Sequence, residues 1–172
     1  SFLFHGGEVY GWDMDIQGSR ERILDSVLPH EITHMIFASY FRCPLPRWAD
    51  EGASTSVEHP SEIAKHKQML IDFLRTRRAI PFSQMMTMTE YPNDIMPLYA
   101  QGHAVADFLM QQKGKRAFLS FLADGIQSQK WSTTVRKHYG YKNLLALQND
   151  WLDWIKQGRP AIPSEMDAGP AP

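Results

Sequence analysis

Hydrophobic residues along this chain recur mostly at intervals of three and four, the spacing of one face of an α-helix. Residues 8–17 differ, because β-forming residues there alternate in part with polar ones and glycines lie on both sides. This segment is the only one for which we predict a strand. From residue 19 to about 41 the spacing is helical, and Ser19 suits the N-cap position. The pattern therefore predicts a mainly α chain, an α+β fold with a small N-terminal β element.

Pro29 lies inside this first helical pattern. Proline removes one backbone hydrogen bond of a helix, and its ring crowds the carbonyl group four residues earlier, here that of Asp25. We therefore expect a kink or a break just before His30. Farther along, Pro44 and Pro46 are expected to end the helix.

The remainder of the chain is predicted to be helical as well. We predict helices at residues 48–57, 61–79, 98–112, 116–123, 132–139 and 144–156. Residues 80–97 are expected to form an irregular connection with one helical turn. The positions where helices should stop are marked by Gly114, Gly125, Gly140 and Gly158. The segment 159–172 is rich in Pro, Gly and Ala, and we predict that it is disordered.

Length and charge narrow the class of protein. The 172 residues, 43% of them hydrophobic, suffice for one domain, which we place at residues 1–158. Lys and Arg number 18 against 19 Asp and Glu, without a long run of one sign, which argues against nucleic acid or an anionic membrane as partner. No stretch is apolar enough for membrane insertion. The chain begins with Ser1 rather than Met, and we expect it to be a fragment of a longer protein whose other domains are possible partners.

Residues 30–34 read His-Glu-Ile-Thr-His and carry the strongest chemical signal. A helix turns about 100° per residue, so His30 and His34 project from one face on adjacent turns. Two imidazoles placed in this way can hold one Zn²⁺, and Glu31 lies beside them, able to reach a metal-bound water. The alternative is that both histidines are ordinary residues of a helix face.

A catalytic zinc site needs a third protein ligand and leaves its fourth position open. Glu51 is our candidate, because it lies on the next predicted helix after the proline-rich turn. Sixteen residues separate it from His34, enough for the first helix to end and the chain to return antiparallel. Gly52 and Ala53 beside it suit close packing of the two helices. The alternative is that Glu51 is a solvated side chain.

The sequence from His30 to His34, followed by Trp48-x-x-Glu51-Gly52, resembles the gluzincin superfamily of zinc peptidases, and most closely its peptidase MA-like domains. Residues 46–53 and the helix from Leu98 to Leu109 resemble further motifs of that group, and the resemblance spans residues 8–157. It implies a zincin-like helical domain in which Zn²⁺ is bound by His30, His34 and Glu51. It also implies that Glu31 is the general base in the hydrolysis of a peptide or protein substrate.

The resemblance also implies a downstream Tyr or His that stabilises the tetrahedral intermediate. Tyr99 is our first candidate, His103 one turn further is the second, and Tyr91 is the third; the alternative for Tyr99 is a half-buried packing residue. The strand around residues 9–12 would lie above the cleft as its edge strand. The residues that could orient a zinc-bound imidazole are Asp50, Ser54, Thr55 and Asp107.

The function predicted in this way is that of a zinc-dependent peptidase. One rival is a catalytically silent zinc-binding scaffold or recognition domain of a larger protein. Glu31 argues against this rival, because a scaffold has no need of a general base. A second rival is a zinc hydrolase that acts on a substrate other than a peptide, since the same ligands and base suit that chemistry.

Overall fold

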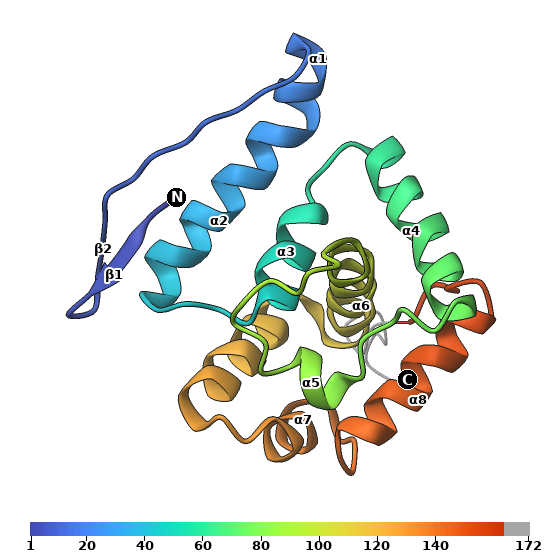
Figure 1. Cartoon of the computed structure of the whole chain (residues 1–172). Helices are drawn as coiled ribbons and strands as arrows, with labels where there is room; N and C mark the ends of the chain where they lie inside the picture. Colours follow the sequence, from blue (N-terminus) through green and yellow to red (C-terminus); the bar gives the residue numbers. More distant parts are fainter. Residues whose placement is uncertain (164–172) are drawn as a thin grey trace, which may run out of the picture.

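The computed structural model describes residues 1–163, and it shows a mainly helical chain with one small sheet, as predicted (Figure 1). Leu3–His5 (β1) and Glu8–Tyr10 (β2) pair antiparallel, with Phe4 opposite Val9. The helices, in chain order, are α1 (Arg20–Arg22), the π-helical turn η1 (Ile23–Val27), α2 (Leu28–Phe41), α3 (Arg47–Thr55), α4 (Pro60–Arg75), α5 (Phe82–Met85), α6 (Met96–Ser128), α7 (Trp131–Tyr139) and α8 (Leu144–Lys156).

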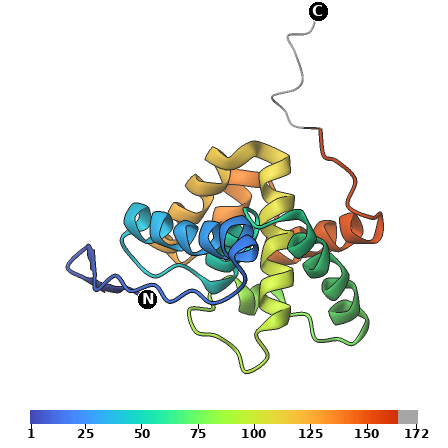
Figure 2. The same cartoon turned by 90° about the horizontal axis from the view of Figure 1, so that it is seen from above.

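Helix α6 lies at the centre of the molecule, and the other helices surround it (Figure 1). Figure 2 shows α6 along its length, with the N-terminal hairpin projecting from the helical body. The core is built mainly from the apolar faces of α3, α6, α7 and α8, and Trp48, Phe118 and Trp151 are among its fully buried side chains. Burial of these large side chains is the main source of stability.

Helices α3 and α6 cross with their backbones in contact. A Cβ atom added to Gly52 would lie 2.3 Å from the carbonyl oxygen of Gly102, and one added to Gly102 would lie 2.5 Å from that of Trp48. Only glycine permits such an approach. Gly52 does pack closely, but against α6, so the predicted packing of this glycine against the first helix was wrong.

The strand prediction was partly wrong. Within the predicted strand 8–17 only Glu8–Tyr10 pairs, and β1, which we did not predict, supplies its partner. Residues 11–17 contain no strand. A strand persists only where a neighbour satisfies its backbone groups, and β1 is three residues long, so the pairing ends with it.

Pro29 does not break the helical segment in which it lies. The π-helical turn η1 lies directly before α2, and Pro29 occupies the first turn of that helix. In a π-turn each N–H bonds to a carbonyl five residues back, as Leu28 does to Ile23, which suits a place where proline disturbs the ordinary pattern. Ser19 caps α1 by accepting a hydrogen bond from the backbone N–H of Arg22, as predicted.

Gly114 interrupts α6 with a left-handed φ of 80°, which confirms the predicted boundary between residues 112 and 116. The predicted stop at Gly125 was wrong, because α6 continues to Ser128. Gly125 is instead a packing position, where an added Cβ would lie 2.2 Å from the Trp131 ring. Helix α4 ends at Arg75 rather than at residue 79, because Arg77 turns left-handed with a φ of 58°.

Residues 159–163 form no helix or strand, but they contact the helical body. The indole N–H of Trp154 donates to the carbonyl of Pro160 (2.8 Å), and the N–H of Ile162 donates to the side-chain carbonyl of Gln111 (3.2 Å). The rest of the predicted disordered tail, 164–172, lies outside the described residues. Within residues 1–163 no helix has the length and apolar character needed to cross a membrane.

Candidate metal centre

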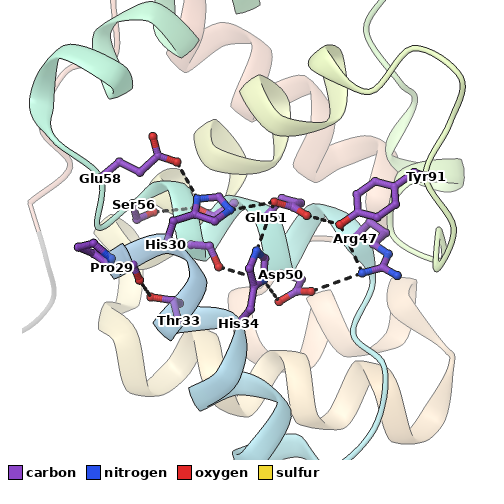
Figure 3. A network of polar contacts seen from close by, with 12 residues as sticks. Pro29, His30, Thr33, His34, Arg47, Asp50, Glu51, Ser56, Glu58 and Tyr91 are labelled. Atoms are coloured by element: carbon purple, nitrogen blue, oxygen red, sulfur yellow. Dashed lines mark hydrogen bonds and ion pairs between the residues drawn. The ribbon is translucent and has the colours of Figure 1, made fainter. Parts of the chain in front are cut away.

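Two helices bring the predicted ligands together. His30 and His34 lie on adjacent turns of α2, with ring centroids 4.8 Å apart, and Glu51 faces them from α3 (Figure 3). One carboxylate oxygen of Glu51, Oε2, lies 3.2 Å from His30 Nε2 and 3.6 Å from His34 Nε2. Both imidazoles therefore present the same nitrogen to one point.

The opposite nitrogen of each ring is held by another carboxylate. His30 Nδ1 donates to Glu58 Oε1 (2.6 Å), and His34 Nδ1 donates to Asp50 Oδ1 (2.7 Å) (Figure 3). Ser54 Oγ lies 3.2 Å from His34 Nδ1. When the Nδ1 proton is used in this way, a neutral imidazole keeps its lone pair at Nε2. Asp50 and Glu58 thus set the tautomer in which both Nε2 atoms can accept a cation.

These carboxylates also change the protonation of the centre. Burial lowers the pKa of His30, but hydrogen bonds to Glu51 and Glu58 outweigh it and raise the pKa to about 9. Burial opposes charge at His34 too, yet Asp50 and Glu51 raise its pKa to about 10. Burial raises the pKa of Glu51, and its hydrogen bonds to both histidines lower it well below the usual range. In the metal-free protein, protonated His30 and His34 therefore form charged hydrogen bonds and ion pairs with the surrounding carboxylates.

Glu31 occupies a different position from Glu51. One carboxylate oxygen of Glu31 lies within 4.8 Å of a ring nitrogen of His30 and of a ring nitrogen of His34. These two nitrogens are also within 4.8 Å of each other. No described residue forms a hydrogen bond or ion pair with Glu31, whereas Glu51 is bonded to both histidines and to Tyr91. The two glutamates therefore differ in their contacts: Glu51 is held by both histidines and Tyr91, and Glu31 has no bonded partner among residues 1–163.

A cleft of about 700 Å³, the histidine cleft, opens over this cluster. His30, Glu31, His34 and Glu51 line it together with Phe2 and Phe4 from the N-terminal segment, and Tyr91 and Tyr99 from the opposite side. The residues expected above the cleft were 9–12, but the N-terminal residues that line it are Ser1, Phe2 and Phe4. The reason is the order of the hairpin, which places β1 and the residue before it on the side of the cleft.

Two tyrosines reach the centre from outside α2 and α3. The Tyr91 hydroxyl donates to Glu51 Oε1, and the guanidinium of Arg47 lies 4.3 Å from the Tyr91 ring centroid. The Tyr99 ring stacks parallel to that of His30, with centroids 6.4 Å apart. Burial and the charge of Glu51 raise the pKa of both tyrosines, so both hydroxyls keep their protons and can donate.

The structure does not bring His103 to the histidine cleft. Its Nδ1 lies 3.4 Å from Ser56 Oγ, and the side chain lines a different cavity. The crossing at Gly52 and Gly102 explains this, because Tyr99 precedes the crossing along α6 and His103 follows it. Asp107, another candidate, accepts a hydrogen bond from Gln111 instead of from a histidine of the centre.

Glu58 was missed by the sequence reasoning. It lies beyond the end of α3, and nothing in its local sequence distinguishes it from a solvated glutamate. Its contact with His30 depends on the way the chain turns after Thr55. Asp50 and Ser54 were considered beforehand, and both contact His34. Thr55, also considered, is buried, and its hydroxyl has no partner in the described chain.

Comparison of the chain with protein-family models, with curated proteins and with solved structures gave no match.

Proposed function

We propose that this protein is a zinc-dependent peptidase whose metal ligands are His30, His34 and Glu51. The observation that carries the proposal is the convergence of both Nε2 atoms on one oxygen of Glu51, while both Nδ1 atoms donate to carboxylates. Two imidazoles and one carboxylate are a ligand set typical of catalytic zinc, with a position left open. The donor set therefore fits zinc.

Bound zinc would supply a Lewis acid that polarises a substrate carbonyl and lowers the pKa of a water molecule. Glu31 is the group of this chain that would take a proton from the attacking water. It lines the cleft, lies beside both histidines and has no competing partner among residues 1–163. The same carboxyl group would then deliver the proton to the leaving amine.

The tyrosines supply the donors that a tetrahedral intermediate requires. Tyr99 remains the first candidate, because it lines the cleft and its ring stacks on that of His30. Tyr91 has its hydroxyl engaged by Glu51 and is the second candidate. A donor of this kind typically contributes a factor of roughly 10²–10³ to kcat.

The test compares wild type with Glu31→Gln, which keeps the shape of the side chain and removes the base. Zinc content is measured by elemental analysis, and turnover with a peptide library. We expect the variant to retain zinc and to lose cleavage. Glu21→Gln is the matched control, because Glu21 is exposed on α1. It should leave both quantities unchanged.

Two results would overturn the proposal. Wild type that binds zinc but cleaves no peptide would favour the scaffold, or a hydrolase of another substrate, and ester and amide substrates would then separate those two. Wild type that does not bind zinc would remove the metal-dependent function altogether.

A further inference from the structure

A second cavity, of about 560 Å³, is separate from the histidine cleft. Residues of α2, α3, α4 and α6 line it, and α2 and α4 lie on either side of α3 and α6 in Figure 1. Among the described residues it shares no lining residue with the histidine cleft. Its volume lies within the range of sites that hold small molecules.

The walls of the second cavity are mostly apolar. They consist of Phe37 from α2, Ile63 from α4, and Met110 and Phe118 from α6, with Val57 after the end of α3. The interruption of α6 at Gly114 adds space, because this glycine lines the cavity and a Cβ placed on it would meet no atom within 4 Å. Such walls favour an apolar chain over a polar ligand.

Two lysines give the cavity its positive charge. Lys67 on α4 and Lys115 on α6 are both exposed and both line it. Among residues 1–163 no acidic side chain forms an ion pair with either, whereas Lys65, on the same helix as Lys67, pairs with Glu62 at 2.6 Å. Ammonium groups without an internal partner are suited to the head group of an anionic ligand.

The other polar side chains that line the cavity offer no cationic group to an anionic head. Ser56 donates to the carbonyl of Gly52 (2.9 Å) and so can only accept from His103 Nδ1. Burial lowers the pKa of His103 to about 4, so this side chain is neutral. Asp107 accepts a hydrogen bond from Gln111 at 2.9 Å. The anionic head therefore belongs at the lysines, with the apolar chain directed inward.

We propose that the second cavity binds a fatty acid, with its carboxylate at Lys67 and Lys115 and its chain between α2, α4 and α6. This site is separate from the proposed peptidase centre and does not depend on it.

The test follows the methyl resonances of methionine by NMR, because the methionines report on location. Met110 lines the second cavity, and Met35 lines a hollow beside Glu31 and His34. Dodecanoate should shift the Met110 signal in a saturable way and leave Met35 in place. Dodecanol and dodecyltrimethylammonium have the same chain with a neutral or a positive head, and both should bind at least about tenfold more weakly.

The double variant Lys67→Glu and Lys115→Glu should weaken dodecanoate binding about tenfold or more. The matched control is Lys130→Glu with Lys142→Glu, which reverses two exposed charges outside the cavity and should bind like wild type. All four positions are exposed, and unchanged spectra without ligand will verify the fold. The proposal is overturned if dodecanoate leaves Met110 unshifted, if the three head groups bind equally, or if the two double variants bind alike.

Discussion

The two helices that carry the candidate metal ligands are held in the molecule in opposite ways. All residues of α3 from Trp48 to Thr55 are buried, and its backbone rests on α6. In α2 only Ala38 is buried, and Ile36 and Tyr40 are 57% and 63% exposed. Glu51 is therefore placed by apolar packing, whereas the histidines are placed largely by polar bonds that cross from α2 to α3 and Glu58.

This difference indicates that α2 and α3 are sensitive to different kinds of substitution. A packed helix fixes its side chains through many weak contacts, and no single one is decisive. A helix held by a few hydrogen bonds depends strongly on each of them. Stability should therefore respond most to changes in α3, and metal affinity should respond to the polar groups that hold α2.

The largest expected effect is that of Gly52→Ala. The added methyl group would overlap the Gly102 carbonyl, so the helices must separate, at a cost of about 3 kcal/mol or more. Urea unfolding measures the loss. Ser120→Ala, at an exposed position of α6, is the control and should change stability by less than about 0.5 kcal/mol. Equal stability of the two variants would contradict the close crossing.

Next in size is the loss of the bond that holds His30. Glu58→Ala should weaken zinc binding roughly 10–100-fold, because the imidazole loses the acceptor that fixes its orientation. Glu58→Gln keeps an acceptor oxygen and should recover part of that loss. Competition with a chromophoric chelator measures the affinities. Glu62→Gln serves as the control, since Glu62 pairs with Lys65 outside the centre. Full affinity in Glu58→Ala would show that packing alone orients α2.

The stability of the metal-free protein should change with pH by less than the two substitutions above change stability or zinc affinity, but this change reports directly on the protonation of His30 and His34. The folded-state pKa values of His30 and His34 lie near 9 and 10, above the ordinary 6.5, so their stabilising contribution is complete below pH 6.5. It is lost as the pH rises through 9 and 10. Thermal unfolding in the presence of a chelator should therefore show a falling Tm over that interval.

Zinc should reverse this trend, because the metal competes with the same protons and binds more tightly as the pH rises. Titration calorimetry in buffers with different ionisation enthalpies will count the protons released at pH 7. If zinc binding released no protons, the histidines would already be neutral in the metal-free protein at pH 7. That result would contradict the raised pKa values of His30 and His34.

The smallest effect is expected on the outer face of α2. Ile36→Lys and Tyr40→Ser alter exposed side chains, and each should change the free energy of unfolding by no more than about 0.5 kcal/mol. Chemical denaturation is sufficient to measure this. A loss of several kcal/mol would mean that this face is covered in solution, and that α2 and α3 differ less in their packing than their exposed fractions indicate.

Local patterns allowed much of this molecule to be predicted. The four-residue separation of His30 and His34 places both on one face of any helix, and the i, i+3, i+4 spacing of apolar residues locates most helices to within a few positions. The spacing from His34 to Glu51, with the prolines at 44 and 46 between them, allowed a return of the chain. These inferences need only the geometry of a helix and the chemistry of proline.

Other features depend on distant parts of the chain, and only the tertiary structure decided them. Gly125 has the residue type of a helix stop, but it lies inside α6, where the ring of Trp131 packs against it. Tyr99 and His103 share one face of one helix, yet the crossing at Gly102 assigns them to different cavities. Glu58 reaches His30 across 28 positions of sequence. Periodicity describes one element at a time, whereas contacts between elements follow from how all of them pack together.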